Sequence, residues 1–136
     1  MTARGKEPLE RVLGPLETEV MNIVWDLGDA TVRDVHEALN SRRTIAYTTV
    51  MTTMGRLAEK GFLKKIEDRH AHVYSPLVSR QQYARSTVKS VVDWLIVQFR
   101  EPTVAYLVDR VGRDDYELIE TLREAIAQRE RAHRDD

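Results

Sequence analysis

The chain has 136 residues, enough for one compact unit or two small ones, and its 42% hydrophobic and 32% charged residues are typical of a soluble, helix-rich protein. Cysteine is absent, which excludes disulfides, thiolate metal sites and cysteine nucleophiles. The net charge of −1 excludes a uniformly basic surface, but the segment from Arg42 to Arg69 holds seven basic residues against three acidic ones.

The first predicted helix begins after a polar N-terminal stretch. Gly14 and Pro15 predict its start, because a proline in the first turn lacks only an N–H that has no helical partner. Apolar residues then recur at helical spacing: Leu16, Val20, Ile23, Val24 and Leu27. Trp25 is expected at the edge of the core, and Gly28 ends the helix.

Two further helices are predicted in close succession. Thr31 and Asp34 have the spacing of a capping box, which predicts the start of a short second helix. Residues 44–61 then form a third helix that ends at Gly61. Its apolar stripe is expected to comprise Tyr47, Val50, Met54, Leu57 and Ala58. Its opposite face carries Thr48, Thr49, Thr52, Thr53 and Arg56.

The threonine-rich face of the third helix suggests a function. Lysine, glutamate or glutamine would build a solvated helix face better than threonine does. A threonine hydroxyl can bond phosphate or a base edge, and its methyl can contact thymine. One reading is therefore a DNA recognition helix, and the other is a helix with an ordinary polar outer face.

A β-hairpin is predicted directly after the third helix. Residues 62–67 and 72–76 are β-prone, and residues 68–71 form the turn between them. A hairpin in this place is the wing of a winged helix, and its basic residues would reach phosphates or the minor groove. These residues are Lys64, Lys65, Arg69 and His70. The alternative is that the two lysines only protect an exposed edge strand.

The rest of the chain is predicted to be helical. Ser79 and Gln82 form a capping box for a long helix to about Arg100, and Pro102 starts a shorter one. Gly112 ends that helix, and Asp114 or Asp115 caps the last one. Residues 129–136 are expected to form a mobile tail.

These C-terminal helices carry apolar stripes that are too broad for so short a segment to bury alone. We therefore predict a winged-helix domain over residues 1–78 and a helical dimerisation domain over residues 79–136. The alternative is that the helices fold back onto the winged helix of the same chain. The residues expected to pair two copies are Val88, Val91, Val92, Leu95, Phe99, Leu107, Leu118 and Leu122.

Residues 13–80 resemble the winged-helix domain of the penicillinase-repressor family, the BlaI/MecI/CopY group of bacterial repressors. The resemblance is carried by residues 16–25, Thr31-Val32-Arg33-Asp34-Val35, residues 46–52, Arg56-Leu57 with Lys60-Gly61, and Tyr74-x-Pro76. It implies a homodimer whose third helix enters the major groove of a palindromic operator in double-stranded DNA. Thr48, Thr49, Thr52 and Arg56 would then face the bases, while Arg42, Arg43, Lys64, Lys65 and Arg69 would contact phosphates.

The wing departs from the pattern of many relatives, which have Gly-Arg near the tip where this chain has Arg69-His70. Relatives in β-lactam resistance are inactivated by cleavage of an Asn-Phe bond, triggered by a membrane sensor. This chain has no Asn-Phe pair, and the matching region lies around Tyr106-Leu107-Val108. The cysteine cluster of copper-responsive relatives is absent as well.

No residue pattern of an enzyme is found, and neither a cofactor nor a metal is expected. His70 and His72 are better explained as surface or phosphate-contacting residues than as metal ligands. No apolar run could cross a bilayer and the N-terminus lacks a signal-peptide core, so a cytoplasmic protein is expected. The remaining alternative function is a winged-helix module that docks proteins and does not read DNA.

Overall fold

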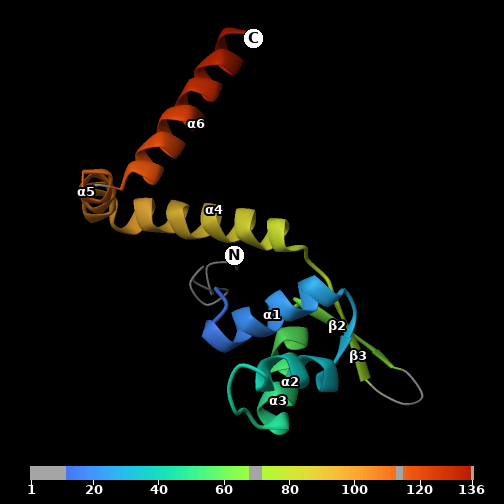
Figure 1. Ribbon diagram of the computed structural model, residues 1–136. Helices are drawn as coiled ribbons and strands as arrows, with labels where there is room; N and C mark the ends of the chain where they lie inside the picture. The colour runs from blue at the N-terminus through green and yellow to red at the C-terminus, as the bar shows by residue number, and fades with distance from the viewer. Residues whose placement is uncertain (1–11, 68–71, 113–114, 136) are drawn as a thin grey trace. The chain divides into compact units, whose positions relative to one another are not determined.

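The computed structural model describes residues 12–67, 72–112 and 115–135. Contacts divide the chain into two compact units, Met1–Val91 and Val92–Asp136. In chain order the elements are α1 (Pro15–Leu27), β1 (Ala30–Thr31), α2 (Val32–Asn40), α3 (Tyr47–Glu59), β2 (Leu63–Glu67), β3 (His72–Pro76), α4 (Arg80–Gln98), α5 (Arg100–Val111) and α6 (Tyr116–Arg134) (Figure 1). This mainly helical architecture with a small sheet confirms the predicted fold class.

The predicted capping signals of α1 and α2 are confirmed. Pro15 lies in the first turn of α1, and the backbone N–H of Gly14 donates to Oε1 of Glu17 at 3.0 Å. Thr31 and Asp34 exchange two bonds of 3.0 Å, each side chain accepting from the other residue's backbone N–H. These bonds satisfy amide groups that a helix start otherwise leaves without partners, so both starts are fixed by local sequence.

The sheet contains one strand more than the predicted hairpin. The strand order is β1-β3-β2, with all pairs antiparallel. Residues 63–67 and 72–76 form the hairpin as predicted, and the turn at 68–71 lies outside the described residues. β1 places Ala30 opposite Tyr74 and Thr31 opposite Val73. The sheet therefore ties the wing to the residue that caps α2.

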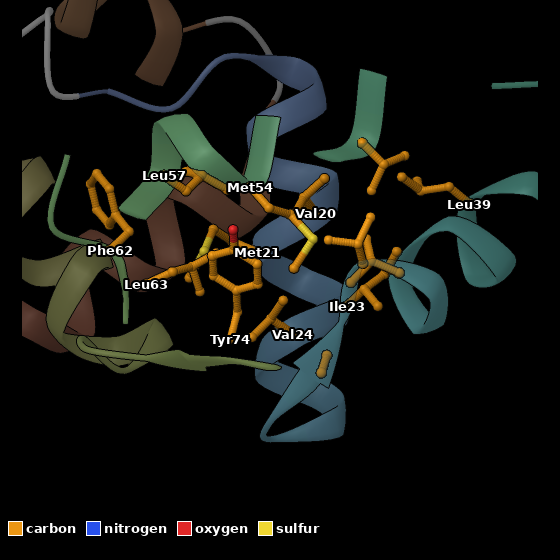
Figure 2. Packing of buried hydrophobic residues seen from close by; sticks show 14 of the residues in the cluster. Val20, Met21, Ile23, Val24, Leu39, Met54, Leu57, Phe62, Leu63 and Tyr74 are labelled. Carbon is orange, nitrogen blue, oxygen red and sulfur yellow. The ribbon is translucent and has the colours of Figure 1, made fainter. Parts of the chain in front are cut away.

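The core of the first unit lies between α1, α2, α3 and the sheet. Figure 2 shows side chains of α1 directed toward Met54 and Leu57 of α3, toward Leu39 of α2 and toward Leu63 and Tyr74 of the strands. Val50, Met54 and Leu57 have no exposed surface. One face of α3 is therefore buried in the core, and the opposite face is exposed to solvent.

Three predictions about which helix face a residue occupies are wrong. Tyr47 is 46% exposed, because it is the first residue of α3 and lies at the edge of the core. Thr53 is only 5% exposed, and its hydroxyl donates to the carbonyl of Thr49 at 2.8 Å. That bond removes most of the penalty for burying a hydroxyl. Leu27, expected on the apolar face of α1, is 55% exposed in the last turn.

The first turns of α4 are held against α1. The indole Nε1 of Trp25 donates to the carbonyl of Val78 at 2.8 Å, and the hydroxyl of Tyr83 accepts from the backbone N–H of Leu13 at 2.8 Å. The guanidinium of Arg80 lies 5.4 Å from the centre of the Trp25 ring. The first compact unit therefore includes the beginning of α4, while the domain boundary at residue 78 stays a prediction.

The second unit contains the end of α4, α5 and α6. The helix breaks at Phe99, and α5 already begins at Arg100, so the predicted break at residues 101–103 is wrong by a few residues. Asp115 caps α6, its carboxylate accepting from the N–H of Leu118 at 3.1 Å. α6 continues to Arg134, which corrects the predicted tail: Glu, Arg and Ala favour helix, and basic residues stabilise a helix C-terminus.

Candidate nucleic-acid interface

The outer face of α3 is accessible. Thr48, Thr49, Thr52 and Arg56 are all exposed, on the side of the helix away from Val50, Met54 and Leu57. This helix thus presents three hydroxyl groups and one guanidinium within its exposed surface. Hydroxyl and guanidinium groups donate to phosphate oxygens and to base edges, so this face has the chemistry of a groove-reading surface.

The start of α3 is fixed by bonds from α2. Nε2 of His36 donates to the carbonyl of Ile45 at 2.8 Å, and the side-chain oxygen of Asn40 accepts from the N–H of Ile45 at 3.2 Å. Ala46, the N-cap residue, is extended and provides no side-chain cap. The position of α3 thus depends on its contacts with α2 and the core more than on a capping box of its own.

Two basic residues beside α3 form ion pairs with α1. Arg43 pairs with Glu19, and Nζ of Lys60 lies 2.8 Å from Oε2 of Glu17. Burial raises the pKa of Glu17, but the hydrogen bonds from Lys60 and Gly14 and the positive charges of Lys60 and Arg56 outweigh it, so the pKa is lowered. Part of the basic charge of residues 42–69 is therefore balanced by carboxylates of α1.

The wing brings one of its two lysines toward α3. Lys64 and Lys65 are both exposed on β2, and successive strand residues point to opposite faces. A recess of about 1360 Å³ lies between α2, α3 and the wing. Lys65 lines this recess together with residues of all three elements, including Thr31, Arg33, His36, Glu37, Tyr47, Met51, His72 and Tyr74. Arg69 and His70, the predicted wing tip, lie outside the described residues.

Arg42 is exposed in the turn between α2 and α3, beside Arg43. The predicted site residues that the structure describes therefore lie on α3, on the turn before it and on the wing strand after it. Sequence reasoning missed Tyr47 and Met51, which are each 46% exposed on α3. Tyr47 is predicted to lie in the core because it is apolar, and no position is predicted for Met51. The structure shows that both side chains are exposed to solvent.

Apolar side chains remain uncovered on α4, α5 and α6. No residue of these helices is buried. Among the residues predicted to pair two copies, Val88, Val92, Phe99, Leu107 and Leu122 are each between 39% and 61% exposed. Val91, Leu95 and Leu118 are half-buried. Exposed large apolar side chains in this number are typical of helices that pack against a partner.

Neither a membrane span nor a metal site is found in the parts of the chain that the structure describes. None of their helices has the length and apolar character needed to cross a bilayer. Histidine and carboxylate side chains do not gather there in groups of three or more that could hold a metal ion.

Comparison with known proteins gives consistent matches. The penicillinase repressor family model matches residues 13–128. The transcriptional regulator BlaI of Mycobacterium tuberculosis H37Rv is 40% identical over 123 residues, covering 89% of this chain and 87% of that protein. The methicillin resistance regulatory protein MecI of Mammaliicoccus sciuri is 30% identical over 77 residues, covering 57% of this chain and 63% of MecI.

A solved structure is also similar, that of the monomeric form of Bacillus licheniformis BlaI in complex with the blaP half-operator. It is 26% identical, with a TM-score of 0.47, and the match covers 53% of this chain and 88% of that one.

Proposed function

The chain belongs to the penicillinase repressor family and is a DNA-binding transcriptional repressor, not an enzyme; we propose that it binds a palindromic operator in duplex DNA as a homodimer. The observation that carries this proposal is the exposed face of α3, with Thr48, Thr49, Thr52 and Arg56 beside a lysine-bearing wing. We propose that the protein acts in the cytoplasm, because the operator DNA that it would bind lies there.

We assign base reading and phosphate contact to different residues. Thr48, Thr49 and Thr52 would bond base edges or phosphates, and Arg56 would read guanine. Phosphate contacts would come from basic residues that flank α3 on both sides in the sequence. These are Arg42, Arg43, Lys64, Lys65, Arg69 and His70. Arg43 would have to exchange its pairing with Glu19 for a phosphate, so its net contribution is expected to be smaller than that of Arg42.

Dimerisation is inferred from the uncovered apolar surface of the C-terminal helices. A segment of fewer than about sixty residues rarely builds an adequate core alone. The side chains of Phe99, Leu107 and Leu122 remain at least 41% exposed, which is costly in water. In a symmetric dimer, a second copy would cover these side chains with its own apolar surface. The two-fold axis of such a dimer would match the symmetry of a palindromic site.

Release from DNA is proposed to follow an event that weakens this pairing. The residues that match the cleaved bond of some relatives, Tyr106, Leu107 and Val108, are between 52% and 66% exposed on α5. A protease controlled by a membrane sensor could act there, although the Asn-Phe bond itself is absent.

The direct test is to incubate the purified full chain with random duplex DNA and to sequence the retained fragments. We expect a two-fold symmetric motif. Its affinity should fall linearly with salt on logarithmic axes, with a slope set by the number of phosphates contacted. If no motif is enriched, or if binding is insensitive to salt, the chain acts instead as a protein-docking module.

The assignment of Arg56 gives a sharper prediction. Replacing Arg56 with alanine should weaken operator binding by about 1–3 kcal/mol and relax the preference at one base pair of each half-site. Titrations against the selected operator and its single-base variants would measure both effects. Arg123→Ala is the matched control, because Arg123 is an exposed arginine on α6 with 74% of its side chain accessible. Unchanged selectivity in Arg56→Ala would show that another residue reads that base pair.

A further inference from the structure

An apolar pair interrupts the polar exposed surface of α3. Tyr47 and Met51 lie one helical turn apart, and each is 46% exposed. Each is next in sequence to a threonine of the candidate reading face, Thr48 and Thr52, which are also exposed. Residues four apart on a helix are neighbours, so the two apolar side chains form a stripe beside the row of hydroxyls.

The tyrosine of this stripe is held in place before any ligand arrives. The rings of His36 and Tyr47 meet edge to face, with centroids 5.6 Å apart and planes at 72°. The His36 ring is itself fixed by its bond to the carbonyl of Ile45 at 2.8 Å. A pre-positioned aromatic ring loses little conformational entropy on contact with a ligand. The stripe is therefore exposed to solvent and also ordered enough to bind a ligand.

The surroundings of the stripe favour an anionic ligand. Tyr47 and Met51 form one wall of the recess of about 1360 Å³ between α2, α3 and the wing. Lys65 lines the same recess, while Arg33 and Glu37 in its wall pair with each other at 3.8 Å. These three charges sum to +1, so the recess is positive next to an apolar wall. A ligand that suits it combines phosphates with a small apolar group.

We propose that Met51 and Tyr47 are specificity residues that recognise thymine by contact with its C5-methyl group in the major groove. The methyl group of thymine is the apolar feature that base pairs present in that groove, so an apolar stripe beside DNA-facing hydroxyls discriminates thymine from cytosine. Lys65 would contact the phosphate that borders the same groove edge. This inference rests on the proposed operator binding and assigns a base preference to residues outside the predicted reading set.

The test removes the methyl group from the DNA and the side chain from the protein, alone and together. Each thymine of the selected operator is replaced in turn by deoxyuridine, which keeps base pairing and lacks only the C5-methyl. For the unaltered chain, at least one symmetric pair of replacements should weaken binding about fourfold per half-site, the value of one buried methyl. In Met51→Ala or Tyr47→Ala, the same replacement should have no further effect.

Two variants serve as controls in the same titrations. Met51→Leu keeps an apolar side chain of similar volume and should retain the response to the methyl group. Leu27→Ala removes an apolar side chain that is 55% exposed on α1 and should leave both affinity and methyl response unchanged.

The outcomes separate this inference from the proposal on which it rests. A methyl effect that disappears in Met51→Ala or Tyr47→Ala supports the inference. If the operator is bound but no methyl effect couples to either residue, the inference is wrong and the repressor function stands. If no operator is selected at all, the proposed function fails together with the inference.

Discussion

Replacing Leu57 with alanine should destabilise the first unit by about 2–5 kcal/mol. Leu57 has no exposed surface and lies in the core between α1, α3 and β2. Its removal leaves a cavity that the helices cannot close without losing their other contacts. Urea unfolding followed by the fluorescence of Trp25, in a Trp94→Phe background, would measure the change in the free energy of unfolding. A loss of this size is a large part of the total stability of a small domain.

The control for this prediction lies on the same helix. Met51→Ala removes a side chain that is 46% exposed, so its free energy of unfolding should change by no more than about 0.5 kcal/mol. The two variants together distinguish the buried face of α3 from its outer face. Equal destabilisation by both would mean that the helix is rotated relative to the arrangement described above, and the reading face would have to be reassigned.

Replacing Leu122 with aspartate should abolish the proposed homodimer. Leu122 is 41% exposed on α6, and in the dimer its side chain would be covered by the partner. A carboxylate buried without a partner costs several kcal/mol, and each copy of the dimer would carry one. Sedimentation velocity should show a monomer. The affinity for the full operator should fall by about 10²–10⁴, because two linked half-site contacts become one.

Gln128→Asp is the control for this prediction. It adds the same negative charge to an exposed position about 120° away from Leu122 around α6 and should leave the dimer intact. If Leu122→Asp still sediments as a dimer at the same protein concentration, the pairing surface does not include this face of α6. Binding of a half-site should be nearly unaffected in both variants, because α3 is not altered.

Local signals in the sequence predicted the starts of most helices correctly. The Thr31–Asp34 pair and Asp115 act through hydrogen bonds to residues three positions away, and Pro15 acts by lacking an N–H that the first turn would leave without a partner. The Ser79–Gln82 box is also present, with bonds of 2.8 and 3.0 Å. Such bonds need no information about the tertiary structure, which is why the sequence pattern suffices to place them.

Features that depend on distant residues could not be predicted. β1 has two residues, too few for a periodic pattern, and exists because β3 offers it a partner. The break at Phe99 comes before Pro102, because a proline is tolerated within the first turn of α5. The contact of Trp25 with Val78 joins residues 53 positions apart.

The candidate site was predicted in part. Helical periodicity placed Thr48, Thr49, Thr52 and Arg56 outside, and they are exposed. The same periodicity misplaced Thr53 and Tyr47, because each lies near the boundary between the two faces, where a small rotation decides burial. The pairing of Lys60 with Glu17 spans 43 positions in the sequence, so no local pattern indicates which basic residues are already engaged within the domain.

The short strand β1 has a consequence for how such a protein changes its DNA preference over evolution. Thr31 pairs with Val73 of the wing and also caps α2, so the backbone itself sets the distance between β3 and the helices that precede α3. Insertions or deletions in the connection between β2 and β3 would leave that distance unchanged. The connection between β2 and β3 can therefore change in length or sequence while β3 stays paired with the residue that caps α2.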